Sequence, residues 1–111
     1  MKFVALDSVP EEGVSHDPEI RKRVLLRRGD LPHLTNFARA RLLPGHRTTA
    51  HAHADMSEVF MVESGSGLML VAGREVELRP GVCVAVEPGE AHEVSNNGGA
   101  ELVLLYFGVE A

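Results

Sequence analysis

The chain has 111 residues, of which 44% are hydrophobic and 24% are charged, and these values are ordinary for a single globular domain. Sixteen acidic residues against eleven basic ones give a formal net charge of −5, which argues against nucleic acid and anionic membranes as partners. The longest apolar run, Leu102–Phe107, is far shorter than the roughly 20 residues that a membrane-spanning helix needs.

The sequence also predicts a cytoplasmic protein. The first apolar segment, Phe3–Leu6, is shorter than the roughly 7–15 apolar residues of a secretory signal. The single cysteine, Cys83, cannot form an intramolecular disulfide, and we expect it to pack as a small hydrophobic residue in a strand. Six histidines stand out from this plain background.

We predict an N-terminal extension over residues 1–20, followed by a single barrel domain over residues 21–111. Within the extension, residues 2–6 are strand-like and could add to the sheet edge of a neighbouring molecule, so we expect a homodimer. The best helical candidate is the segment 17–23, because Asp17 suits an N-cap and is followed by proline at the first helical position. The basic run Arg21–Arg23 is interpreted as solvated or subunit-pairing charge.

The rest of the chain is dominated by short apolar or alternating runs that are separated by Gly, Pro and Asn turns. Such runs at regular spacing are typical of a sandwich or a barrel, so the predicted fold class is all-β. The predicted strands lie at 24–26, 37–43, 59–62, 67–72, 76–78, 82–86 and 102–107.

Two arginines on one predicted strand leave two interpretations open. Arg39 and Arg41 are two residues apart and therefore share a face of the strand. Facing inward, they would line a pocket and could clamp a carboxylate. Facing outward, they would form a solvated or interface stripe, and we favour this interpretation because most arginines are exposed.

A candidate metal site follows from the spacing of three histidines and one glutamate. His51 and His53 share a face of an extended segment, and Glu58 begins the next apolar run after a connection short enough to return it beside them. His92, at the end of another apolar run, could add a third imidazole. Such ligands suit a divalent transition metal. The plainer alternative is a set of half-buried polar residues at a barrel mouth.

These residues carry a resemblance to a known family, the cupin superfamily. Its first motif is matched at every fixed position by Gly45-x5-His51-x-His53-x4-Glu58-x6-Gly65. Its second motif is similar to Gly81-x5-Glu87-Pro88-Gly89-x2-His92-x3-Asn96, in which the proline stands one place later than the family pattern has it. The resemblance implies a double-stranded β-helix (jelly-roll) barrel. It also implies that His51, His53, Glu58 and His92 are the metal ligands.

The resemblance further implies a small metalloenzyme of the dioxygenase, decarboxylase or isomerase class, acting on a small oxygenated molecule. The expected cofactor is one divalent transition metal (Mn, Fe, Ni or Zn), whose two open positions would receive ligand oxygens or dioxygen. Phe60 and Val62 lie on the same strand face as Glu58 and are predicted to line the pocket, with ordinary barrel core as the alternative. No general base can be assigned.

Two other functions stay open at this point. The first is a metal-dependent small-molecule binding module without turnover, and the second is a barrel in which a metal only holds the strands together. The family commonly forms dimers, which agrees with the homodimer expected from the N-terminal residues.

Overall fold

The computed structural model describes residues 1–111, and its regular secondary structure is almost wholly β-strand, which confirms the all-β fold class. The one helical element is the short 3-10 helix η1 (Leu6–Ser8), so the structure has no helix with the length to cross a membrane. The strands are β1 (Glu12–Val14), β2 (Asp17–Arg27), β3 (Leu34–Leu42), β4 (Met56–Ser64), β5 (Gly67–Val71), β6 (Arg74–Leu78), β7 (Cys83–Val86), β8 (His92–Ser95) and β9 (Leu102–Glu110).

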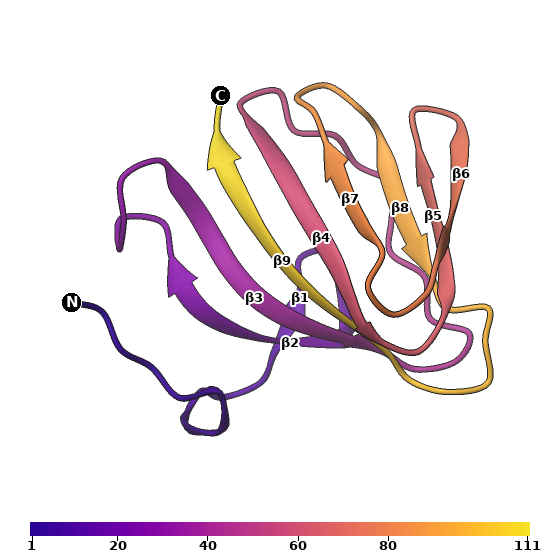
Figure 1. Cartoon of the computed structure of the whole chain (residues 1–111), viewed down its shortest axis with the longest axis horizontal. Helices are drawn as coiled ribbons and strands as arrows, with labels where there is room; N and C mark the ends of the chain where they lie inside the picture. Colours follow the sequence, from indigo (N-terminus) through magenta and orange to yellow (C-terminus); the bar gives the residue numbers. More distant parts are fainter.

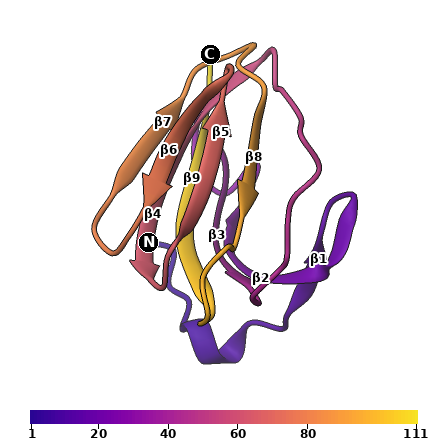
Figure 2. The same ribbon diagram turned by 90° about the vertical axis from the view of Figure 1, so that its right-hand side faces the viewer.

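The strands form two antiparallel sheets that face each other across one core. The larger sheet has the order β1-β2-β3-β9-β4-β7, and the smaller one has the order β6-β5-β8 (Figures 1 and 2). The chain thus follows the predicted jelly-roll, although the two sheets are not joined into a closed ring of hydrogen bonds.

The alternation of side chains along the strands places the core between the sheets. On β3, the inner residues Ala38, Ala40 and Leu42 are buried, whereas Arg39 and Arg41 alternate with them and face outward. The largest fully buried side chains come from both sheets and are Ile20, Leu42, Val62, Met69, Leu78 and Leu102.

The predicted helix over 17–23 is wrong, because this segment begins strand β2. Its residues Ile20 and Val24 are buried, and β2 pairs with β1 on one side and β3 on the other. Asp17 caps no helix: its carboxylate accepts hydrogen bonds from the N–H of Thr49 at 2.8 Å and from its hydroxyl at 2.9 Å. The large sheet therefore begins within the range 1–20 that was expected to be an extension.

The segment 44–55, which carries two of the predicted ligands, is extended but forms no regular strand. It runs beside β8 through two isolated bridges, Arg47 with Ser95 and His51 with His92. The N–H of Thr48 also donates to the carbonyl of Val94 at 2.8 Å. These contacts place the segment along the free edge of the smaller sheet, opposite the strands of the larger one.

Cys83 was expected to be buried, but the structure leaves it exposed on β7. Because side chains alternate along the strand, Val84 and Val86 face the core and Cys83 faces outward.

Candidate metal centre

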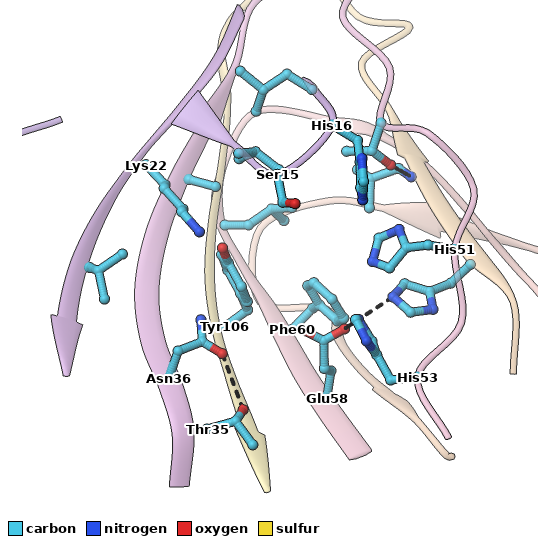
Figure 3. Close-up of a pocket in the computed structure, with 18 of the residues that line it drawn as sticks. Ser15, His16, Lys22, Thr35, Asn36, His51, His53, Glu58, Phe60 and Tyr106 are labelled. Carbon is cyan, nitrogen blue, oxygen red and sulfur yellow. Dashed lines mark hydrogen bonds and ion pairs between the residues drawn. The ribbon is translucent and has the colours of Figure 1, made fainter. Parts of the chain in front are cut away.

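Three histidines and one glutamate meet on one wall of a cavity between the two sheets (Figure 3). The nitrogen and oxygen atoms that His51, His53, Glu58 and His92 can offer to a metal all lie within 4.8 Å of one another. Glu58 and His92 are buried, whereas His51 and His53 stay partly accessible. The structure therefore brings together all four residues that the spacing singled out.

Backbone pairing explains why the two motifs meet. The N–H of His51 donates to the carbonyl of His92 at 3.1 Å, and the N–H of His92 donates back to the carbonyl of His51 at 2.9 Å. The N–H of Gly89 donates to the carbonyl of His53 at 2.7 Å and ties the turn after β7 to the same segment. Glu58 comes from the opposite sheet, where it lies on β4 between β7 and β9.

Two of the imidazoles are oriented by backbone carbonyls. The Nδ1 atom of His51 lies 2.9 Å from the carbonyl oxygen of Thr49, and that of His92 lies 3.0 Å from the carbonyl oxygen of Glu90. Because a carbonyl can only accept a hydrogen bond, each Nδ1 carries a proton, and Nε2 is the ring nitrogen left to face the cluster. Such an outer hydrogen bond is the usual way in which proteins hold a metal-binding histidine.

The donor set fits a divalent metal. One carboxylate oxygen of Glu58 lies 3.1 Å from Nε2 of His92 and 3.2 Å from Nε2 of His53. A carboxylate oxygen and an imidazole lone pair repel each other unless a proton or a metal ion lies between them. Ligands about 2.1 Å from one ion and at right angles to each other are about 3 Å apart, as these atoms are.

The pKa of His92 reflects this environment. Burial lowers the pKa, but the hydrogen bonds to Glu58 and to the Glu90 carbonyl, with the charges of both carboxylates, raise it above its ordinary value. In the absence of a metal, the buried imidazole therefore holds a proton more firmly than a free histidine does. Metal binding must displace that proton.

The cavity beside the cluster has a volume of about 690 Å³. Its aromatic wall is formed by Phe60 and Tyr106, whose rings stack with their centroids 5.4 Å apart, and Phe60 also meets the ring of His92 edge-on at 5.9 Å. Burial, together with the negative charges of Glu58 and Glu12, raises the pKa of Tyr106 well above its usual range, so the phenol keeps its proton. Phe60 is thus part of the cavity lining, and it also belongs to the hydrophobic core cluster.

The other residues predicted to line the pocket lie elsewhere. Val62 is only 1% exposed and packs in the hydrophobic core, deeper along β4 than Phe60. Arg39 and Arg41 face away from the cavity, as the outward interpretation expected. Arg39 forms a two-pronged pair with Glu63 at 2.6 and 3.0 Å, and Arg41 pairs with Glu11 and Glu101, both at 2.7 Å.

Lys22, Asn36 and Tyr106 are among the cavity residues that escaped the sequence interpretation. Lys22 was grouped with its basic neighbours as surface charge, although it lies two residues from each of the apolar residues Ile20 and Val24 and so shares their face of the strand. That spacing was the available indication that Lys22 faces inward. Tyr106 lies within an apolar run, where the sequence gives no sign of which residues face a cavity.

The remaining histidines lie outside the cluster. His33 is exposed, with a left-handed φ of 68°, and His46 accepts a hydrogen bond from the N–H of Leu43 at its Nδ1, at 3.2 Å. His16 is exposed and also contributes to the cavity lining.

Comparison with known proteins identifies relatives of this chain. A family model described as "Cupin domain" matches residues 38–108. Among curated proteins, an oxalate-binding protein of Thermotoga maritima is 30% identical over 69 residues, which is 62% of this chain and 57% of the relative. An uncharacterized protein of Methanocaldococcus jannaschii is 27% identical over 63% of this chain and 56% of its own length. The match thus spans little more than half of each curated relative.

Solved structures share the fold over nearly the whole chain. A predicted oxalate decarboxylase from Thermotoga maritima superposes with a TM-score of 0.91 and 24% identity, covering 98% of this chain and 99% of its own. A sugar phosphate isomerase of a cupin superfamily, from Silicibacter pomeroyi, gives a TM-score of 0.82 and 22% identity, covering 98% of this chain and 76% of its own. At these identities the likeness concerns the fold.

Proposed function

The chain belongs to the cupin family, and on that premise we propose that it is a metalloenzyme acting on a small oxygenated molecule. One divalent transition metal would be held by His51, His53, Glu58 and His92. The observation that carries this proposal is the convergence of four suitable donor atoms within 4.8 Å on a cavity wall. Imidazole and carboxylate ligands suit Mn, Fe, Ni and Zn, and we propose one of these four.

The residues of the chain have separable roles in this proposal. Glu58 supplies the one negative charge of the donor set and leaves a divalent centre with a net charge of about +1. The carbonyls of Thr49 and Glu90 keep two imidazoles aimed at the centre. Phe60 and Tyr106 shield one side from water. A metal bound there would supply Lewis acidity and open positions for ligand oxygens.

We propose a substrate that carries a carboxylate, and a reaction of the decarboxylase, dioxygenase or isomerase class. The net positive charge of the loaded centre favours an anionic oxygen ligand. The names of two relatives, an oxalate-binding protein and a predicted oxalate decarboxylase, support an oxygen-rich carboxylic acid.

A second candidate function is a binding module without turnover. The specific observation in its favour is that the curated relative at 30% identity is named for binding oxalate rather than for converting it. The same donors and the same cavity would serve this role, because holding a carboxylate at a metal needs no group that moves a proton.

Metal binding is tested on the full chain, stripped with a chelator and titrated with Mn, Fe, Ni and Zn under anaerobic conditions. We expect one ion per chain and, at about 100 times the dissociation constant, a stabilisation near 2.7 kcal/mol, or about 10 °C in the melting temperature. His92→Ala should abolish that shift. The matched control is His33→Asn, which removes an exposed imidazole and keeps a residue that tolerates positive φ. Absence of stoichiometric binding to the native chain would refute the proposal.

Turnover separates the two candidates. The loaded protein is incubated with oxalate and with larger carboxylic and 2-oxo acids, while carbon dioxide release, oxygen uptake and new products are followed. Conversion that disappears in His92→Ala supports the enzyme. Metal-dependent binding with no conversion of any acid supports the binding module.

We also propose that the chain forms a homodimer through its N-terminal residues. Phe3 is 87% exposed, and the residues before η1 pair with no strand of their own chain. Light scattering should give the mass of two chains. A monomer at micromolar concentration would reject this assembly.

A further inference from the structure

The cavity has a second charged end, away from the metal ligands. Lys22 lies on the inner face of β2 between the buried residues Ile20 and Val24, and its side chain points into the cavity near Tyr106 (Figure 3). No carboxylate lies within ion-pair distance of its ammonium group, whereas Arg27 and Arg28, which also line the cavity, are each paired with a glutamate. A half-buried ammonium group without a partner is costly, so an anion bound here would be stabilised.

The ion pairs around Lys22 determine how much negative charge this end of the cavity can accept. Arg27 is neutralised by Glu12 at 2.7 Å, and Arg28 is neutralised by Glu110 at 3.0 Å. Glu12 stands opposite Lys22 in the strand register, but its carboxylate is turned toward Arg27. Lys22 is therefore the one lysine or arginine of the cavity lining without an ion pair, and its single charge matches one carboxylate better than a doubly charged phosphate.

Two neutral groups that line the same cavity as Lys22 are free to donate hydrogen bonds. Asn36 accepts a bond from the hydroxyl of Thr35 on its Oδ1 at 3.2 Å, which leaves its Nδ2 without a protein partner. The hydroxyl of Tyr106 makes no hydrogen bond within the chain, and it points toward the same part of the cavity as Lys22 (Figure 3). Together, the ammonium, the phenol and the amide form a set of donors that suits a carboxylate.

The two charged ends are well separated. Lys22 is on β2 and Glu58 is on β4, with β3 and β9 between them. Figure 3 shows Lys22 and the labelled ligands His51 and His53 on opposite sides of the cavity. The cavity volume of about 690 Å³ lies within the range of roughly 300–1,000 Å³ that is typical of pockets for drug-sized ligands. Oxalate, with its two carboxylates on adjacent carbons, is not expected to bridge these two sides.

We propose that the ligand is an elongated dicarboxylate, with one carboxylate at the metal and the other bound by Lys22, Tyr106 and Asn36. This inference rests on the proposed function, because it takes the metal centre as the first anchor. The carbon chain of the ligand lies along the stacked rings of Phe60 and Tyr106. A net charge of about +1 at the loaded centre and the single charge of Lys22 together balance the two carboxylates.

The test uses the metal-loaded full chain and calorimetric titration. The probes are the linear dicarboxylates from oxalate to suberate, each compared with the monocarboxylate of equal length. We expect an intermediate dicarboxylate to bind about tenfold or more tightly than its monocarboxylate partner, whereas oxalate gains nothing from the second end. Lys22→Met, which keeps a long side chain but no charge, should remove this preference. The matched control is Arg74→Met, which removes a positive charge from an exposed position outside the cavity lining.

The outcomes are distinguishable. Metal titration and thermal unfolding come first, and Lys22→Met should bind the metal and unfold as the native chain does. If the native chain binds no metal, the proposed function fails, and this inference fails with it. If metal binding is normal but the preference is missing, or survives in Lys22→Met, only the second anchor is refuted. A preference that peaks at oxalate would likewise refute the elongated ligand.

Discussion

Asn96 is the buried polar residue whose removal should cost the most stability for its size. Its side chain makes three hydrogen bonds, and the residue is only 2% exposed. The Nδ2 atom donates to the carbonyls of Leu42 at 2.9 Å and Ala100 at 2.8 Å, and Oδ1 accepts from the N–H of Gly98 at 2.9 Å. The side chain thus joins the end of β3 to the loop before β9. At about 1 kcal/mol for each bond, Asn96→Ala should lower the free energy of unfolding by about 3 kcal/mol.

Urea unfolding of the metal-free chain measures this loss. The matched control is Asn97→Ala, because Asn97 is exposed and its side chain makes no hydrogen bond, so its change should stay within about 0.5 kcal/mol. Asn96→Asp sharpens the test. The aspartate keeps the shape of the side chain but sets a carboxylate against two carbonyl oxygens. This variant should therefore be less stable than Asn96→Ala at neutral pH, and it should regain stability in acid, where the carboxylate is protonated. A loss below about 1 kcal/mol in Asn96→Ala would contradict this account of the residue.

Three further predictions concern the site and the outer sheet face. Asp17→Asn should weaken metal binding about tenfold in a competitive chelator titration, because Asp17 holds Thr49, whose carbonyl orients His51. An unchanged metal affinity would contradict this role. The pKa of His92 is raised in the folded, metal-free chain, so its proton stabilises that form below about pH 6.5, and this stabilisation is lost as the pH rises through the raised value. The metal-induced rise in melting temperature should therefore be larger at about pH 8 than at about pH 5.5, whereas a constant rise in scanning fluorimetry would count against the histidine ligands. Arg39→Ala should lower the free energy of unfolding in urea by less than about 1 kcal/mol and leave the metal affinity unchanged, because its ion pair with Glu63 lies on the outer face of the sheet. A loss of metal affinity would contradict the independence of this face from the site.

The donor cluster could be predicted from the sequence because its geometry follows from short spacings. Residues two apart on an extended segment share a face, and this places His51 beside His53 with ring centroids 4.9 Å apart, even though the segment is not a regular strand. Glu58 needs only a short return. The contact of His92 with His51 joins distant parts of the chain, and it was accessible through the resemblance to a family rather than through any local rule.

Local rules failed where a tertiary contact overrides them. Asp17 followed by proline is a good helix start in isolation, but here its carboxylate binds Thr49, and the pairing of β2 with two neighbours decides the conformation. Lys22 was misread for a related reason. A run of three basic residues looks like surface charge, and only the buried residues on either side of it show that the middle one faces inward.

The position of the cavity follows from a change in the size and polarity of the inner side chains along three neighbouring strands. In the strand register, the inner residues that stand side by side are small or polar toward one end of β3, β9 and β4, and large and apolar toward the other. Read from the cavity to the closed end, they are Asn36, Ala38, Ala40 and Leu42 on β3, Gly108, Tyr106, Leu104 and Leu102 on β9, and Glu58, Phe60 and Val62 on β4.

Because the three strands are antiparallel neighbours, this order of small and large inner residues cannot arise from one stretch of sequence. Each strand must encode it separately. Gly108 shows that a larger residue does not fit at this position, since a Cβ there would meet the side chain of Thr35 and lie 3.2 Å from the sulfur of Met56. The closed end is filled by interlocking aliphatic side chains that stabilise the sheets. At the other end, the small residues leave the space in which a buried carboxylate, three imidazoles and an unpaired ammonium group can face one ligand.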